Sequence, residues 1–196
     1  DPEVRLVGHS MGSSVVSYYA GAFAEKVVRV AMVEGLGPPE TPLGLVRAQL
    51  QQFVNSTRKR TEQRRELLPM PDVAEAARRI SKVDRMVPTD RATRVAVHAT
   101  REVRDGVVWK YDPLHRARIA VPFRTEVAGA LWKHITAPTL NIRGADSRFV
   151  HPPEEHARRL AMFPDITEAS VAGAGHNIHM HQPGPLAELL AAWLAG

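Results

Sequence analysis

Short apolar runs alternate with longer amphipathic stretches toward both ends of the chain. Four runs have the length and apolar content of buried strands: 4–7, 26–33, 138–143 and, more weakly, 166–171. Three stretches carry apolar residues at helical spacing, and there the pattern predicts helices: 13–23, 153–163 and 186–194. Strands that alternate with helices are typical of a parallel sheet with helices on both faces. The sequence therefore predicts an α/β fold.

The pattern changes between residues 41 and 133. Here the predicted helices are rich in Arg, Gln and Glu, and they cover 43–65, 73–80 and 89–103. A short extended piece follows at 106–113. We interpret this region as a helical insertion, a lid or cap between two strands of the sheet. The predicted domains are a core formed by 1–39 and 134–196 and a helical cap formed by 40–133.

The segment Gly8-His9-Ser10-Met11-Gly12 lies between the first predicted strand and the first predicted helix. A G-x-S-x-G motif in this context indicates a nucleophile elbow, a sharp turn that lifts the serine hydroxyl above the sheet edge. We expect side chains at Gly8 and Gly12 to collide with the neighbouring strand and helix. Ser10 is the candidate nucleophile, and the N–H of Met11 at the helix N-terminus is a candidate oxyanion donor. The alternative is a glycine-rich loop that precedes a helix.

Two later residues complete a serine triad in chain order. Asp146 follows the strand predicted at 138–143, and His176 follows the strand predicted at 166–171. Loops past the carboxyl ends of parallel strands are where open α/β sheets gather their sites. Serine is a poor nucleophile until a base takes its proton, and a carboxylate must orient that base and stabilise its charged form. The sequence thus favours Ser10 as nucleophile, His176 as general acid/base and Asp146 as the orienting acid.

These motifs resemble those of the α/β-hydrolase fold superfamily, and the resemblance covers the whole chain. It rests on the following segments: Gly8-His9-Ser10-Met11-Gly12, Ala137-Pro138-Thr139-Leu140, Arg143-Gly144-Ala145-Asp146-Ser147 and Gly175-His176-Asn177-Ile178-His179-Met180-His181-Gln182-Pro183. The insertion, with Trp109-Lys110-Tyr111-Asp112-Pro113, and the turn at Gly37-Pro38-Pro39 are most similar to the serine-hydrolase-like branch. The resemblance implies hydrolysis of a small-molecule ester, thioester or similar acyl substrate through an acyl-enzyme, without a metal or organic cofactor. We expect His9 and Leu36 to line the substrate site.

The chain departs from the family pattern at the position of the acid. The family usually carries it three residues after the glycine of this loop, where this sequence has Ser147, and Asp146 stands one place earlier. A loop shifted by one residue would still present Asp146 to His176. Some relatives instead use an acid after the strand that follows the elbow helix, which here is Glu34. We favour Asp146 and keep Glu34 as the alternative.

A second departure concerns the strands before the elbow. The family has several, and a loop among them supplies the second oxyanion donor, whereas this chain begins at the elbow strand. We therefore expect a C-terminal fragment of a longer protein, with little activity as it stands. The alternative function is a catalytically incompetent fragment or pseudoenzyme that acts as a binding module.

Composition excludes several other classes of function. The chain has 196 residues and no cysteine, which excludes disulfides, thiolate metal sites and cysteine nucleophiles. No apolar run reaches the roughly 18 residues of a membrane span, so we expect a soluble, cytoplasmic protein. The net charge of +5 is concentrated at 58–65, which we interpret as the solvated face of a helix and not as a nucleic-acid site. His176, His179 and His181 lie in one loop without a carboxylate among them, so we expect no metal site there.

Overall fold

The computed structural model describes residues 3–62, 68–117 and 119–196. The chain divides into two compact units, one formed by Asp1–Glu40 with Phe123–Gly196 and the other by Thr41–Pro122. The predicted boundary at residue 133 therefore differs from the observed one by about ten residues. These residues contain a helix that packs on the sheet unit.

A four-stranded parallel sheet forms the centre of the first unit. Its strands lie in the order β1 (Val4–His9), β2 (Val27–Val33), β5 (Thr139–Gly144) and β6 (Ile166–Val171). Because all pairs are parallel, the carboxyl ends of the strands meet at one edge of the sheet. The register places His9 opposite Val33, so the elbow motif and the end of β2 are direct neighbours.

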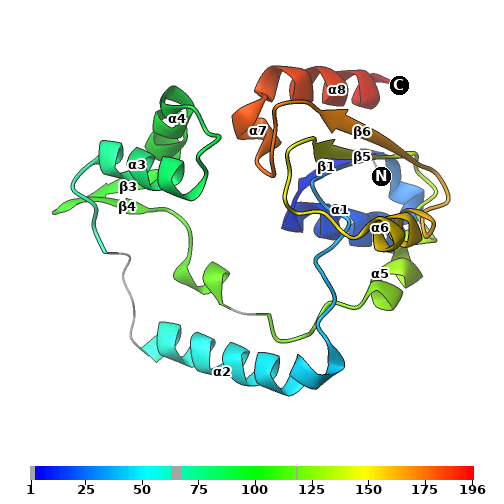
Figure 1. The fold of residues 1–196 in the computed structure, drawn as a ribbon, viewed down its shortest axis with the longest axis horizontal. Helices are drawn as coiled ribbons and strands as arrows, with labels where there is room; N and C mark the ends of the chain where they lie inside the picture. Colours follow the sequence, from blue (N-terminus) through cyan, green and yellow to red (C-terminus); the bar gives the residue numbers. More distant parts are fainter. Residues whose placement is uncertain (1–2, 63–67, 118) are drawn as a thin grey trace. The chain divides into compact units, whose positions relative to one another are not determined.

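Helices cover both faces of this sheet, as Figure 1 shows. One face carries α1 (Met11–Ala22), α5 (Thr125–Trp132) and α6 (Pro153–Leu160), and the other carries α7 (Ile178–His181) and α8 (Pro183–Ala195). A 3-10 turn, η1 (Ala24–Lys26), joins α1 to β2. Alternate residues of β2 enter two separate buried clusters, with Val30 and Met32 in the first and Val33 in the second. The predicted α/β fold with helices on both faces is confirmed.

Helix α5 belongs to the sheet unit because its last residue is a core residue. The side chain of Trp132 is fully buried and stacks on Phe163 with 4.9 Å between ring centroids. Its indole Nε1–H donates a hydrogen bond of 3.0 Å to Oγ of Ser17 on α1. A buried tryptophan with a satisfied N–H is a strong packing anchor. The sequence pattern places these residues in the cap and predicts no helix for them; the structure shows both the helix and the surface on which it packs.

The second unit is mainly helical and includes a small hairpin. Its elements in chain order are η2 (Leu43–Leu45), α2 (Val46–Glu62), α3 (Val73–Val83), α4 (Thr89–Ala99), β3 (Thr100–Val103), β4 (Gly106–Trp109) and η3 (Pro113–Arg116). The helix predicted over 89–103 ends at Ala99, because residues 100–103 pair antiparallel with 106–109. Gly106 has a φ of +124°, and a Cβ there would overlap the carbonyl oxygen of Met70. The tight turn of the hairpin therefore requires glycine at this place.

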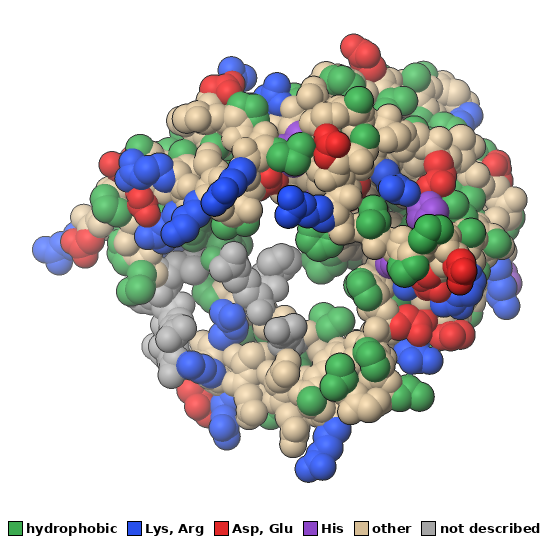
Figure 2. Space-filling view, in the orientation of Figure 1, with side chains coloured by type: hydrophobic (Ala, Val, Ile, Leu, Met, Phe, Trp, Pro, Cys, Tyr) green, Lys and Arg blue, Asp and Glu red, His purple; other side chains and the backbone are tan. Residues whose placement is uncertain are grey.

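The basic segment predicted at 58–65 lies partly outside the described residues, which end at Glu62 in this region. Within α2, Arg58 pairs with Glu62 at 3.9 Å, with both side chains exposed, and Arg60 donates to the carbonyl of Pro113 at 3.3 Å. On the face drawn in Figure 2, Lys and Arg side chains lie among Asp and Glu side chains. None of the helices in the described ranges has the length and apolar content needed to cross a membrane.

Candidate active site

Ser10 occupies the turn between β1 and α1 in a conformation that L-residues rarely adopt. Its φ is +55° and its ψ is −117°, and its N–H donates to the carbonyl of Val33 at 2.8 Å. This is the strained strand-to-helix turn that the motif predicts, held in place by the neighbouring strand. The strain is maintained because the hydrogen bond to β2 and the start of α1 fix the residues on either side.

The two glycines of the motif have different environments. A Cβ on Gly8 would overlap the carbonyl group of Gly12, so the close approach of β1 to α1 requires glycine there. A Cβ on Gly12 would meet no described atom within 4 Å. The expectation that both positions exclude a side chain is therefore wrong for Gly12, because that residue faces open space on the first turn of α1.

His176 brings an imidazole to the serine from the loop between β6 and α7. Its Nε2 lies 2.9 Å from Oγ of Ser10, although the two residues are 166 positions apart in the chain. The ring is half-buried, and its Nδ1 faces away from Ser10 toward a carboxylate. Nε2 can therefore accept the serine proton while Nδ1 donates its own proton to the carboxylate.

The carboxylate beside His176 is that of Glu34, the residue directly after β2. Its Oε2 lies 3.0 Å from Nδ1 of His176, and its side chain is 1% exposed. The N–H of Gly144 donates to Oε1 at 2.6 Å, and the hydroxyl of Ser147 donates to Oε2 at 2.6 Å. Glu34 itself has a φ of +56°, so its backbone too is held in the left-handed region.

These contacts decide the ionisation of Glu34. Burial by itself would raise the pKa of this carboxyl, because it disfavours the charged form. Hydrogen bonds from His176, from Ser147 and from the N–H of Gly144 outweigh that effect and hold the pKa below its ordinary value. The side chain is therefore a buried carboxylate with donors on both oxygens, as an orienting acid requires.

Asp146, which the sequence pattern favours as the acid, lies elsewhere. It is exposed, and its backbone N–H donates to the carbonyl of Ala174 at 2.9 Å in the turn that follows β5. In the part of the chain that the structure describes, its carboxylate has no hydrogen bond with His176. The structure thus places the alternative acid, Glu34, against the imidazole. The reason is topological, since β2 lies next to β1 and its end is directly beside Ser10.

The remaining predicted residues have different positions. His9 lies beside His176, with its Nε2 2.8 Å from the carbonyl oxygen of His176 and its ring edge-on to the ring of His179 at 4.7 Å between centroids. Burial lowers the pKa of the His9 imidazole, so the ring is neutral at neutral pH. Met11 is the first residue of α1, so its N–H has no partner within the helix. Leu36 does not line an open site, because its side chain is 5% exposed within the first buried cluster.

Among the described residues, no group of three or more His, Asp or Glu side chains is arranged to hold a metal ion. In the loop that carries three histidines, His181 is buried, and its Nδ1 accepts the N–H of Gly175 at 2.9 Å. That bond fixes the backbone directly before His176. The contact gives His181 a role in the shape of the loop.

Comparison of the sequence with known protein families identifies the family of this chain. A sequence model described as "Alpha/beta hydrolase family" matches residues 1–189. The chain belongs to the alpha/beta hydrolase family. No curated protein matches its sequence.

Several solved structures of other proteins share the fold of this family member. A thioesterase domain from the curacin biosynthetic pathway is 23% identical, with a TM-score of 0.83 over 98% of this chain and 67% of its own. A hypothetical protein of Pseudomonas aeruginosa is 19% identical, with a TM-score of 0.84 over 99% of this chain and 68% of its own. An esterase of Mycobacterium tuberculosis is 19% identical, with a TM-score of 0.69 over 98% of this chain and 60% of its own. At these identities the likeness shows the fold alone.

Two residues of this alpha/beta hydrolase were not assigned a role in the site from its sequence. Ser147 touches the Glu34 carboxylate, and its Oγ also accepts the N–H of Phe149 at 3.3 Å. The ring of Phe149 lies 4.3 Å from the ring of His176, although the side chain is 74% exposed. The sequence signal for Ser147 is its position, where the family pattern expects the acid. The signal for Phe149 is weaker, since it is only a phenylalanine in a polar loop.

Proposed function

We propose that this chain carries the active site of a serine hydrolase, which cleaves a carboxylic ester or a related acyl substrate through an acyl-enzyme. The observation that supports it most is the unbroken series of hydrogen bonds from Ser10 Oγ to His176 Nε2 and from His176 Nδ1 to Glu34 Oε2, at 2.9 and 3.0 Å. This arrangement has the geometry of a nucleophile, a base and an orienting acid.

The acylation step follows from these positions. Oγ of Ser10 attacks the carbonyl carbon of the substrate while its proton passes to Nε2 of His176. Glu34 stabilises the imidazolium that forms and holds Nδ1–H toward itself. The carbonyl oxygen becomes an oxyanion, to which the N–H of Met11 donates from the N-terminus of α1. His176 then returns the proton to the leaving alcohol or thiol, and the bond between the acyl carbon and that group breaks.

The deacylation step uses the same residues with water as the nucleophile. His176 takes a proton from a water molecule, which attacks the acyl carbon on Ser10, and the proton then passes to Oγ as the serine leaves. The products are a carboxylic acid and the free hydroxyl of Ser10. All the residues in this cycle lie in the sheet unit, and the reaction needs neither a metal nor an organic cofactor.

The substrate class is proposed from the chemistry of the site. Esters and thioesters both present a carbonyl carbon and a leaving group that one imidazolium can protonate. Two structural neighbours, a thioesterase domain and an esterase, are compatible with either substrate. A panel of p-nitrophenyl acyl esters and acyl thioesters of increasing chain length distinguishes the two classes.

The experiment that tests the proposal compares turnover of this panel by the intact protein and by three variants. We expect S10A and H176A to lose turnover by about 10⁴-fold or more. S14A is the matched control, because Ser14 lies on the first turn of α1, four residues beyond the nucleophile, and we expect it to keep turnover within about twofold. Turnover that S10A retains would contradict the proposal, and substrate binding without turnover in the unaltered protein would favour a binding module.

A further inference from the structure

We infer that Arg159 is a positioning residue for the acid of the triad, an inference that rests on the function proposed above. Arg159 lies on α6, away from Ser10 and His176, and its side chain is 1% exposed. Its guanidinium holds the backbone that follows Glu34, and that backbone sets where the carboxylate points.

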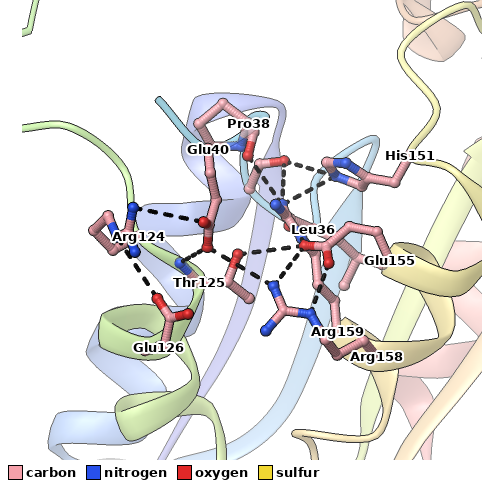
Figure 3. Close-up of polar contacts among 11 residues, drawn as sticks. Leu36, Pro38, Glu40, Arg124, Thr125, Glu126, His151, Glu155, Arg158 and Arg159 are labelled. Atoms are coloured by element: carbon pink, nitrogen blue, oxygen red, sulfur yellow. Dashed lines mark hydrogen bonds and ion pairs between the residues drawn. The ribbon is translucent and has the colours of Figure 1, made fainter. Parts of the chain in front are cut away.

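Three consecutive carbonyl oxygens converge on one nitrogen of Arg159. Nη1 donates to the carbonyls of Leu36 at 2.6 Å, Gly37 at 3.1 Å and Pro38 at 3.0 Å, as Figure 3 shows for Leu36 and Pro38. These residues begin two positions after Glu34, whose own φ of +56° lies in a region that costs an L-residue energy. Such a conformation persists only where its surroundings hold it. Arg159 supplies that hold on the carboxyl side of Glu34.

A buried guanidinium of this kind needs a partner for its charge. Nε of Arg159 donates to Oε1 of Glu155 at 2.6 Å, one turn earlier on α6. The guanidinium also lies over the ring of Phe123, with 5.2 Å from Cζ to the centroid. The planar fork of arginine can bind a carboxylate through one nitrogen and backbone carbonyls through another, which a lysine ammonium cannot do from one position. The chemistry of the contact is therefore specific to arginine.

The same guanidinium joins a second loop to the first. Nη1 lies 3.1 Å from Nε2 of His151, which in turn lies 3.0 Å from the carbonyl oxygen of Gly37. His151 belongs to the loop between β5 and α6, and this loop also carries Ser147, the donor to Glu34 Oε2. Arg159 thus fixes the loop that carries the acid against the loop that carries its hydroxyl donor. Both ends of the 2.6 Å bond between Ser147 and Glu34 depend on this junction.

A loosened junction would displace the Glu34 carboxylate from Nδ1 of His176. A shift of about 1 Å in a catalytic group can cost about 100-fold in rate, even when the altered residue does not touch the substrate. Binding of the substrate need not change, because no contact of Arg159 reaches Ser10. The inference therefore predicts a loss in kcat without a matching rise in KM.

The test measures kcat and KM for ester turnover in the unaltered protein and in the variants R159K and R159M. R158M is the control, because Arg158 is the next residue of the same helix, pairs with the same Glu155 and is 43% exposed. We expect R159K to lower kcat by about 10- to 100-fold with KM within about twofold, and R158M to keep both within about twofold. A side chain that only stabilised the fold would leave the kcat of the folded protein unchanged.

A double-mutant cycle keeps the inference falsifiable if R159M fails to fold. Because Arg159 acts through Glu34, R159K should lower kcat little further in an E34Q background. An R159K protein with unchanged kcat would overturn the inference, and so would losses that are fully additive with those of E34Q. The unaltered protein separates this from the proposed function: if it shows no turnover that depends on Ser10, the function fails, and if it shows such turnover while R159K matches it, only the inference fails.

Discussion

Ser147 donates a hydrogen bond of 2.6 Å to Oε2 of Glu34, the oxygen that lies 3.0 Å from Nδ1 of His176. A hydroxyl thus stands at the position where the family resemblance predicts the acid, and it supports a carboxylate that follows the neighbouring strand, β2. This relationship gives the sharpest predictions, because the two residues can be altered separately and together.

Replacement of Glu34 by glutamine should remove most of the activity. The amide keeps the size of the side chain but cannot stabilise the imidazolium, so we expect kcat/KM to fall by about 10³- to 10⁴-fold. The measurement is the steady-state hydrolysis of a p-nitrophenyl ester. D146N is the matched control, with an expected change of no more than about twofold because Asp146 is exposed. A large loss in D146N together with a small one in E34Q would return the role to Asp146.

An acid moved to position 147 should partly replace Glu34. In E34A the carboxylate is lost, and an aspartate at 147 would stand in the loop that now places a hydroxyl 2.6 Å from the Glu34 carboxylate. We expect E34A/S147D to recover at least about tenfold in kcat/KM over E34A, because the imidazolium regains a carboxylate partner. E34A/S147N, which carries an amide of the same shape, should show no recovery. Equal activity of the two double variants would argue against a charge effect.

The two glycines of the elbow should respond in opposite ways to alanine. G8A places a Cβ against the carbonyl of Gly12, so we expect a loss of about 1–3 kcal/mol or more in the free energy of unfolding. G12A places a Cβ in open space within α1, so we expect stability to stay level or to rise by about 0.5 kcal/mol. Urea denaturation followed by circular dichroism measures both. Equal losses would mean that the helix packs more tightly at Gly12 than the structure shows.

Glu155 should link stability to acid pH. Hydrogen bonds from Arg158 and then Arg159 lower the pKa of its carboxyl to about 2, well below the ordinary value of 4.5. Because the folded-state pKa is the lower one, the stabilisation is complete above about pH 4.5 and is lost as the pH falls toward 2. E155Q leaves the buried Arg159 without its anion, and we expect a loss of about 2–3 kcal/mol at neutral pH.

A comparison of the unaltered protein with E155Q at different pH values tests the lowered pKa of Glu155. The gap in unfolding free energy between the unaltered protein and E155Q should narrow as the pH falls from 4.5 toward 2. E154Q is the control, since Glu154 is exposed on the same turn of α6. A gap that stays constant over this range would show that the carboxylate of Glu155 is not held in its charged form by the arginines.

The sheet and its helices could be predicted because their residues follow simple periods. The run 27–33, for example, is buried at five of its seven positions and is apolar apart from Arg29. The hairpin was harder to predict from the sequence, because residues 100–103 continue the helical pattern of α4 and form a strand only through pairing with 106–109. Residues 125–132 were assigned to the cap for a related reason, since the sequence does not show which surface will bury Trp132.

The residues of the candidate site likewise differ in how far the sequence predicts them. Ser10 and His176 could be identified because the elbow has a sequence signature and the histidine follows the last strand. The choice between Asp146 and Glu34 could not be decided from the sequence, because it depends on backbone angles at Glu34 and on the turn after β5. The contacts of Arg159 could not be predicted from the sequence either, because its partners are backbone carbonyls, which every residue type has.

The central claim is that His176 activates the hydroxyl of Ser10, and covalent labelling tests it most directly. A fluorophosphonate probe reacts with an activated serine, and mass spectrometry of the digested protein identifies the modified residue. We predict one equivalent of label on the peptide that contains Ser10, abolished in S10A, slowed by at least about 10³-fold in H176A and unchanged in S14A. An intact, folded protein that takes no label at Ser10, or labels equally well without His176, would contradict the account.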